Sequence, residues 1–335
     1  MNRTTATIYA VAARAGVSTA TVSRALHNSA KVSPRTRELV MQAATDLNYL
    51  PRAAARTLAA RNTNALGLVL PHVDGFYYAQ LLVGFEVAAS ERGLSTVILL
   101  ANPREDCRGA VRRLATQVDG IAFMARSAAT EDLVSELSGA RAVITGARSQ
   151  VEGVDALFVE NRRPAQELTA HLIEHGRRRI AFVGRREAGS DIGERLKGWQ
   201  RALTEAGLGP GQVIEVDPLE SEGTKVAEGL LAQGMPVDAL VCGNDELALA
   251  IMHRLQASGV RVPDEVAIVG WDDSPTARYI KPGLTTVNQP VVEMGRQAAL
   301  RLADLLNDEP HKAAADTLPV TIVHRGSCGC AEPAA

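Results

Sequence analysis

The chain has 335 residues, of which 46% are hydrophobic and 22% charged, and its formal net charge at pH 7 is −2. This length exceeds that of one compact core and predicts two or three domains. No stretch approaches the roughly 20 apolar residues that a membrane-spanning helix needs, and no signal-peptide pattern follows the first residues. We therefore expect a cytoplasmic protein with no membrane partner.

The net charge conceals an asymmetry along the chain. Residues 1–62 contain nine basic and two acidic side chains, a net of +7, which leaves −9 for residues 63–335. A small cationic segment attached to a large anionic body favours a separate nucleic-acid-binding domain, although a basic end can also be ordinary solvated surface.

Three short helices are predicted within residues 1–50. Apolar residues recur at helical spacing over 8–15, and Gly16 then permits a tight reversal. Ser18 is a good N-cap for a second helix, and Ser33 followed by proline opens a third. Two helices joined by a glycine turn, with a third sharing their core, are typical of a helix-turn-helix domain. The predicted inward-facing residues are Ile8, Val11, Ala12, Ala15, Val22, Leu26, Val40, Ala43, Ala44 and Leu47.

The run from Ile8 to Leu26 resembles the DNA-binding signature of LacI/GalR-type transcription factors, with the core A-G-V-S-x-x-T-V-S-R. Ala10 departs from the family, which usually has an aspartate there. For each serine or threonine of this run, the alternative role is a helix cap or a surface position without a DNA contact. The resemblance implies that Thr19, Ala20 and Arg24 face base edges in the major groove of double-stranded operator DNA. It also implies that Tyr9, Ser18, Thr21 and Ser23 contact phosphates.

Residues 51–62 form an alanine-rich stretch and a polar linker, too short to hold a helix alone in water. The stretch resembles the family's hinge helix, which orders when two subunits meet over the operator. The resemblance assigns Leu58 as an apolar wedge in the minor groove, with Ala55 and Arg56 beside it. Packing of Leu58 against the body is the alternative.

From residue 65 onward, short apolar runs alternate with helical patterns. This alternation predicts βαβ units, and hence an α/β fold with two doubly wound parallel sheets and a ligand cleft between the two lobes. The predicted strands are Ala65–Leu70, Thr96–Leu100, Gly120–Met124, Ala142–Thr145, Ile180–Val183, Val213–Val216, Ala239–Cys242 and Val266–Gly270.

The same region resembles the family's periplasmic-binding-protein-like body. The marks include Gly84-Phe85-Glu86, His175-Gly176, Asn244-Asp245 and Trp271-Asp272-Asp273. His175-Gly176 is interpreted as a helix C-cap, and Asp245 and Asp273 as capping or lobe-bridging groups. The resemblance implies effector contacts at Phe76, Arg195, Asn244, Asp272 and Gln289. His72, Tyr77 and Trp271 are candidates for stacking on the effector, and a place in the core is the alternative for each of them.

Two departures leave the effector open. Pro218 stands where many sugar-binding members have an aromatic residue, and Gly146 where an aspartate is common. A sugar is the favoured effector, with a purine or nucleoside acting as corepressor as the alternative. No other cofactor is expected.

Other classes of protein fit the sequence less well. The chain has no G-x-G-x-x-G after its first strands, no P-loop and no G-x-S-x-G, so no enzyme is predicted. A solute-binding protein would share the body but not the cationic domain. In the Cys328-Gly329-Cys330 segment with His324, only three candidate metal ligands occur, so we expect a disordered end and no metal site.

The sequence therefore predicts a homodimeric, ligand-responsive repressor of transcription. The expected boundaries are a helix-turn-helix domain at 1–50, a hinge helix and linker at 51–62, an effector-binding and dimerisation domain at 63–327 and a tail at 328–335. Within the body, the N-lobe comprises about 63–159 and 290–318, and the C-lobe about 160–289 and 319–327.

Overall fold

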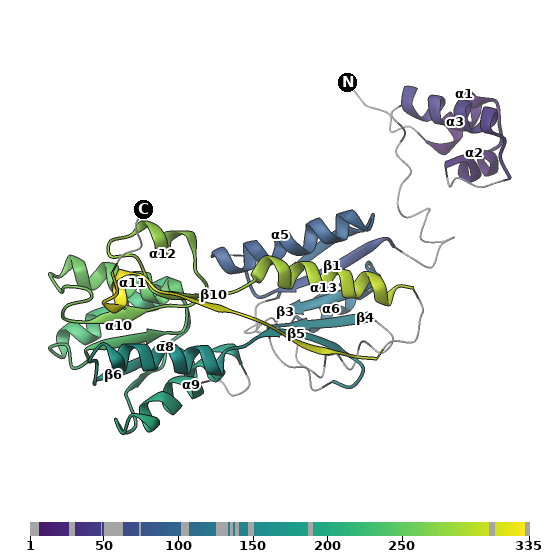
Figure 1. The fold of residues 1–335 in the computed structure, drawn as a ribbon. Coiled ribbons are helices and arrows are strands. Elements are labelled where there is room, and N and C mark those ends of the chain that lie inside the picture. The colour runs from purple at the N-terminus through teal and green to yellow at the C-terminus, as the bar shows by residue number, and fades with distance from the viewer. Residues whose placement is uncertain are drawn as a thin grey trace. The chain divides into compact units, whose positions relative to one another are not determined.

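The computed structural model describes residues 7–26, 31–47, 49, 63–73, 75–101, 107–124, 133–134, 137, 141–146, 151–186, 190–307 and 312–331. The chain divides into two compact units, residues 1–63 and residues 64–335. None of the described helices combines the length and the apolar character that crossing a membrane requires. Figure 1 shows the elements of both units.

The N-terminal unit contains α1 (Ile8–Ala15), α2 (Thr19–Leu26) and α3 (Pro34–Asp46). Gly16 ends α1 with a φ of 66°, a left-handed conformation that glycine adopts without steric cost. The Ser18 hydroxyl accepts a hydrogen bond from the Thr21 N–H at 3.1 Å, and Ser33 caps α3 in the same way. The predicted helices and caps are thus confirmed. One core joins them: Val11, Ala12, Val22, Ala25, Val32, Val40, Ala43 and Ala44.

The N-lobe is built on a six-stranded parallel sheet with the order β11-β5-β4-β3-β1-β2. Helices α5 (Phe76–Glu91) and α13 (Val291–Leu305) cover one face, and α6 (Arg108–Ala115) covers the other (Figure 1). The strands are β1 (Ala65–Leu70), β2 (Ser95–Leu100), β3 (Gly120–Met124), β4 (Arg141–Thr145), β5 (Asp155–Val159) and β11 (Ala315–Leu318).

The α5 and α13 helices cross with almost no space between their backbones. A Cβ atom on Gly84 would lie 1.9 Å from the Val292 carbonyl oxygen, and one on Gly295 would lie 2.1 Å from the Leu81 carbonyl oxygen. Any side chain at either glycine would push the helices apart. These two glycines therefore determine how closely α13 packs against α5 on the N-lobe.

The C-lobe has a four-stranded parallel sheet with the order β7-β6-β8-β9. Helices α8 (Arg162–Glu174) and α9 (Asp191–Glu205) pack on one face, and α10 (Glu220–Ala232) and α11 (Asp245–Ala257) pack on the other. The remaining elements are β6 (Ile180–Val183), β7 (Val213–Ile214), β8 (Ala239–Cys242), β9 (Ala267–Val269), α12 (Pro275–Tyr279), β10 (Thr286–Asn288), β12 (Thr321–Val323) and the 3-10 turn η1 (Gly326–Cys328).

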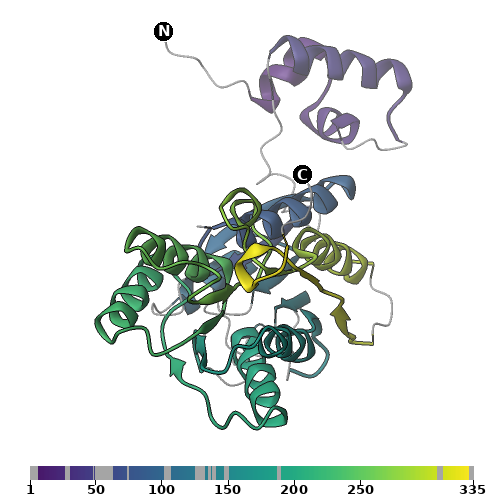
Figure 2. The same ribbon diagram turned by 60° about the vertical axis from the view of Figure 1, so that its left-hand side comes forward.

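The chain passes between the lobes three times: after β5, after β10, and between β11 and β12. Figures 1 and 2 show the last of these crossings in yellow. The α/β fold with two parallel sheets is confirmed. The prediction for Val213–Val216 was too long, because β7 contains two residues, and the short strands β10, β11 and β12 were not predicted.

The expected disordered end is wrong for residues 327–331. Ser327 and Cys328 have no exposed surface, and the Ser327 hydroxyl accepts from the Thr285 N–H and donates to the Ile268 carbonyl. Buried hydrogen bonds to the C-lobe sheet hold this segment, a cause that lies outside the segment's own sequence.

Candidate functional site

The outward side of α2 carries the predicted DNA contacts. Ala20 and Arg24 are exposed on this helix, on the side opposite Val22, while Thr19 and Ser23 are half-buried. Tyr9 on α1 is 74% exposed. The hydroxyls of Ser18 and Thr21 lie 2.9 Å apart and participate in capping α2, which leaves them at the N-terminal end of the helix where a phosphate is favoured. Ala55, Arg56 and Leu58 lie outside the described residues.

Acidic groups are scarce on this unit. The guanidinium of Arg14 pairs with Asp46 through Nε and Nη2, at 3.1 and 2.7 Å, and Gln42 donates to the same carboxylate. These contacts lower the pKa of Asp46, with the Arg14 hydrogen bond as the largest cause. Arg14 therefore serves the fold, because it joins α1 to α3.

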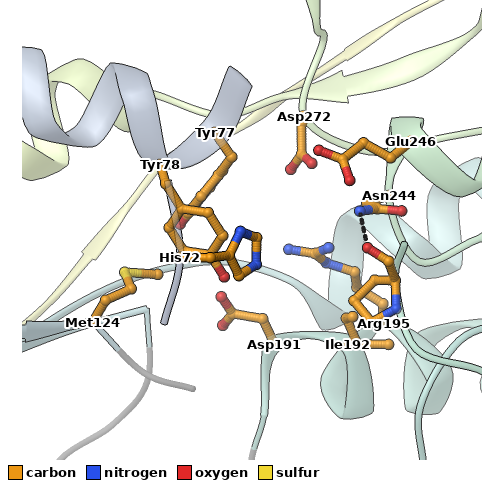
Figure 3. A pocket seen from close by; sticks show the side chains of 11 residues that line it. His72, Tyr77, Tyr78, Met124, Asp191, Ile192, Arg195, Asn244, Glu246 and Asp272 are labelled. Carbon is orange, nitrogen blue, oxygen red and sulfur yellow. Dashed lines mark hydrogen bonds between the residues drawn. The ribbon is translucent and has the colours of Figure 1, made fainter. Parts of the chain in front are cut away.

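A second site lies between the lobes of the body. Its volume is about 70 Å³, and both lobes contribute its walls (Figure 3). Most of the residues follow the carboxyl ends of parallel strands, where ligands bind in open α/β sheets. The lining residues are His72, Tyr77, Tyr78 and Met124 from the N-lobe, and Asp191, Ile192, Arg195, Pro218, Asn244, Glu246 and Asp272 from the C-lobe.

Arg195 is held rigidly in the C-lobe wall. Its Nε donates to the Asn161 side-chain oxygen at 2.8 Å, its Nη1 donates to the Gly243 carbonyl at 2.6 Å, and its Cζ lies 4.4 Å from the centre of the Trp271 ring. Asn161 in turn donates to Asp191 at 2.9 Å. A buried cation oriented by this many partners is organised before any ligand arrives.

Asp272 is the most constrained acid of the site. It has a φ of 115°, which is strained for any residue except glycine, and Gln289 Nε2 donates to its Oδ1 at 2.5 Å. Burial raises the pKa of Asp272 well above its ordinary value, and the nearby Arg195 opposes that rise. Among the described residues, the Oε1 atom of Gln289 is buried with no hydrogen-bond partner.

The N-lobe wall is aromatic. The rings of His72 and Tyr78 meet edge to face with centres 4.5 Å apart, and Tyr77 packs against Tyr78 in the same manner at 5.3 Å. Burial raises the pKa of Tyr77 well above its ordinary value, and the charges of Asp191 and Asp272 add to this rise. Tyr77 is therefore a neutral phenol at any physiological pH.

Four of the six predicted effector contacts line the cavity: His72, Arg195, Asn244 and Asp272. Gln289 reaches the site through Asp272. Phe76 is half-buried at the first position of α5 and is not one of the lining residues. Asn244 caps α11 by accepting from the Leu247 N–H and donates to the Pro218 carbonyl, so its amide already has protein partners.

The sequence reasoning missed Tyr78, Met124, Asp191, Ile192 and Glu246. Position gives a signal for some of them: Met124 ends β3, Asp191 opens α9, and Glu246 follows Asn244 at the start of α11. Asp245 and Asp273 take structural roles. Asp245 accepts from the Ser274 N–H and the Thr286 hydroxyl, and Asp273 pairs with Arg325 at 2.6 Å.

A helix-turn-helix domain and a two-lobed body with a lined cleft define a ligand-responsive DNA-binding protein. Family models agree: residues 7–52 match bacterial regulatory proteins of the lacI family, and residues 169–328 match a periplasmic binding protein-like domain. The chain is 32% identical to catabolite control protein A of Priestia megaterium over 96% of this chain and 98% of that protein. It therefore belongs to the lacI family and is a transcriptional regulator rather than an enzyme.

Solved structures extend the similarity to the whole chain. A complex of the transcriptional regulator CelR with cellobiose aligns with a TM-score of 0.72 and 33% identity, and covers 96% of this chain and 99% of CelR. The lac repressor dimer bound to operator and the anti-inducer ONPF aligns with a TM-score of 0.84 and 26% identity, with coverage of 96% and 99%.

Proposed function

We propose that this regulator is a repressor that binds a pseudo-palindromic operator as a homodimer. We further propose that a neutral, hydroxyl-rich effector of the sugar class controls its DNA affinity from the cavity between the lobes. The observation that carries the effector class is the set of side chains around that one cavity, where Asp191, Glu246 and Asp272 lie with Arg195.

Hydroxyl groups suit this set because each both donates and accepts. Carboxyl groups accept from hydroxyls, and a guanidinium donates to them. Even without Asp272, whose pKa burial raises, the two acids Asp191 and Glu246 outnumber the one guanidinium of Arg195. The cavity is therefore unfavourable for a phosphorylated or carboxylated ligand, which would bring a further negative charge into a partly buried site. That the similar regulator CelR has been solved in complex with cellobiose supports a sugar as the effector class.

A purine or nucleoside is the second candidate, and the aromatic wall favours it. His72, Tyr77 and Tyr78 present rings against which a flat base packs. A nucleoside also offers ribose hydroxyls to the acids. A sugar without a purine base should bind if the first candidate is right, and should not bind if the second is right. Binding of such a sugar therefore distinguishes the two candidates.

For the DNA complex, we propose that Thr19, Ala20 and Arg24 contact base edges and that Tyr9, Ser18, Thr21 and Ser23 contact phosphates. The exposed positions of Tyr9, Ala20 and Arg24 support this assignment. One such domain contacts few base pairs, so two half-sites read by a dimer supply the specificity. Ala55, Arg56 and Leu58 would enter the minor groove between the half-sites. The similarity to the lac repressor, solved as a dimer bound to operator, supports a dimer on DNA.

Gln289 offers a route from the cavity to the N-lobe. It donates to Asp272 in the cavity wall and stands directly before Pro290 and α13, which packs on the N-lobe. The cavity volume of about 70 Å³ is small for a sugar. We therefore expect the lobes to rotate when an effector binds, and the crossing segment at Gln289 to transmit that rotation.

Isothermal titration calorimetry tests the effector class. We expect at least one neutral sugar to bind the full chain, the matching sugar phosphates to bind more weakly, and Asp272→Asn to reduce sugar affinity by up to about 10-fold, as the loss of one hydrogen bond between uncharged groups does. Asparagine has nearly the same size and shape as aspartate, so this variant adds no bulk at the strained backbone position. Glu91→Gln, at an exposed site on α5, is the control and leaves affinity unchanged. If nucleosides bind and none of the sugars does, the second candidate would be favoured.

A further inference from the structure

The ordered C-terminal segment brings together histidine and cysteine side chains that are far apart in the sequence. His171 lies on α8, His324 follows β12, Cys328 lies in η1 and Cys330 comes two residues later. His171 and Cys328 are 157 positions apart, yet Nε2 and Sγ lie 3.3 Å from each other. The fold of the C-lobe alone creates this cluster.

The cluster offers four ligand atoms to one point in space. One nitrogen from each histidine and the sulfur from each cysteine all lie within 4.8 Å of one another. Nε2 of His171 is 3.3 Å from both sulfurs. In a tetrahedral zinc site, with Zn–S near 2.3 Å and Zn–N near 2.0 Å, the ligand atoms stand about 3.3 to 3.8 Å apart. The two distances of 3.3 Å from His171 fall in this range, and no pair of the four atoms is more than 4.8 Å apart.

The surroundings of Cys328 and His171 suit side chains that bind a metal ion. Cys328 has no exposed surface, and the Thr285 hydroxyl lies 3.1 Å from its sulfur, close enough to donate to a thiolate. The rings of His175 and His324 lie tilted against the ring of His171, with centres 4.4 and 4.3 Å away.

Charge balance also favours a divalent ion. Two thiolates and one divalent cation sum to zero, so a half-buried site of this composition carries no net charge. A donor set of two sulfurs and two imidazole nitrogens in tetrahedral arrangement is typical of zinc. The sequence count of three candidate ligands did not include His171, which is remote in sequence and brings the number of candidate ligand atoms at this point to four.

We propose that His171, His324, Cys328 and Cys330 bind one Zn²⁺ ion and thereby fasten the C-terminal segment to α8. The site is distinct from the effector cavity, with which it shares no residue. All four ligands belong to the C-lobe, and Thr285, next to Cys328, directly precedes β10. The ion would fix the position of the strand that leads to Gln289 and the crossing between the lobes.

Metal binding is tested on the full chain without a histidine tag, reduced with a phosphine. Zn²⁺ is added in competition with a chromophoric chelator, and Co²⁺ replaces it for spectroscopy. We expect one equivalent of Zn²⁺ per chain, a rise in melting temperature with Zn²⁺, and a Co²⁺ spectrum with tetrahedral visible bands and a thiolate charge-transfer band. These measurements on the unaltered chain do not depend on any variant folding.

Variants locate the ion. Cys330 is half-buried and His324 exposed, so Cys330→Ser and His324→Gln leave the core intact. Each removes one ligand and is expected to weaken Zn²⁺ binding by more than about 10-fold, the smallest effect typical of changes around a metal. The matched controls Cys107→Ser, at the start of α6, and His253→Gln, exposed on α11, keep the wild-type affinity.

Three results would overturn the proposal. The first is fewer than half an equivalent of Zn²⁺ bound, or a Co²⁺ spectrum without thiolate charge transfer. The second is unchanged affinity in both Cys330→Ser and His324→Gln. The third is a Cys328–Cys330 disulfide that persists in the reduced chain by mass spectrometry, because the thiolates would then be absent.

Discussion

Arg24 shows how α2 presents one residue to an external partner while a nearby residue packs in the core. It lies exposed on α2, two residues after Val22 and so on the opposite side of the helix, while Val22 is fully buried in the core of the three helices. The apolar residue seats the helix, and the basic residue is left for an external partner. An arginine in a major groove forms two hydrogen bonds with one guanine, so it contributes to base preference as well as to affinity.

Arg24→Ala is expected to relax base preference within each half-site, with a loss of about 1–3 kcal/mol of discrimination at the contacted base pair. Fluorescence anisotropy on a panel of singly substituted operators measures this change. Arg35→Ala removes the same charge from an exposed position on α3 and should weaken all operators equally. An unaltered preference profile in Arg24→Ala would refute the base contact.

Asp245 shows a buried acid that serves structure. Its carboxyl accepts from the Thr286 hydroxyl at 2.6 Å and from the Ser274 N–H at 2.7 Å, so it joins the start of α11 to α12 and β10. Burial raises the pKa of Asp245 to about 6, although these hydrogen bonds oppose the rise. The folded chain therefore holds the proton more tightly than the unfolded chain does.

The free energy of unfolding should consequently fall as the pH rises from about 4 to about 6, because the folded state binds the proton of Asp245 across this range and the unfolded state does not. A pKa difference of roughly two units corresponds to about 3 kcal/mol. Urea unfolding from pH 4 to pH 8 measures the effect, and Asp245→Asn should show a flatter profile. Parallel profiles for the two proteins would contradict the assignment.

At the scale of elements, the crossing of α5 and α13 depends on two glycines. Gly84→Ala would place a methyl group against the Val292 carbonyl, so we expect overpacking that costs about 1–3 kcal/mol or more. Gly229→Ala is the control, because it lies inside α10 with no atom within 4 Å of the added carbon. There the better helix propensity of alanine should stabilise the chain slightly. Equal urea midpoints for the two variants would show that the crossing tolerates the methyl group.

The strands illustrate what a local pattern predicts. The ranges predicted for Ala65–Leu70, Gly120–Met124, Ile180–Val183 and Ala239–Cys242 coincide with β1, β3, β6 and β8, all fully buried runs in the interior of parallel sheets. β11 is largely exposed, and β10 and β12 are three residues each, so their composition carries no comparable signal.

At the scale of the whole molecule, effector and operator binding are linked through one equilibrium. The operator must change effector affinity by the same factor by which the effector changes operator affinity. We expect the Kd of the effector, measured by calorimetry, to differ with and without a saturating operator duplex, and to match the shift of the operator Kd. Identical effector affinity in both conditions would reject coupling between cleft and DNA.

The sequence alone was sufficient for the helix-turn-helix domain, the α/β body and the family, because these depend on local spacing, caps and contiguous motifs. The family resemblance also pointed to Arg195 and Asp272, and both line the cavity between the lobes. The outward positions on α2 followed from helical periodicity, which needs no tertiary contact.

Tertiary structure alone decided which side chains meet. Tyr78 and Glu246 line one cavity from opposite lobes, and His171 meets Cys328 across 157 positions. No spacing rule relates such residues, because sheet order and the three crossings between the lobes set their distances. For the same reason, the segment around Cys328 was taken for a disordered end, although buried hydrogen bonds from Thr285 and Ser327 hold it in the C-lobe.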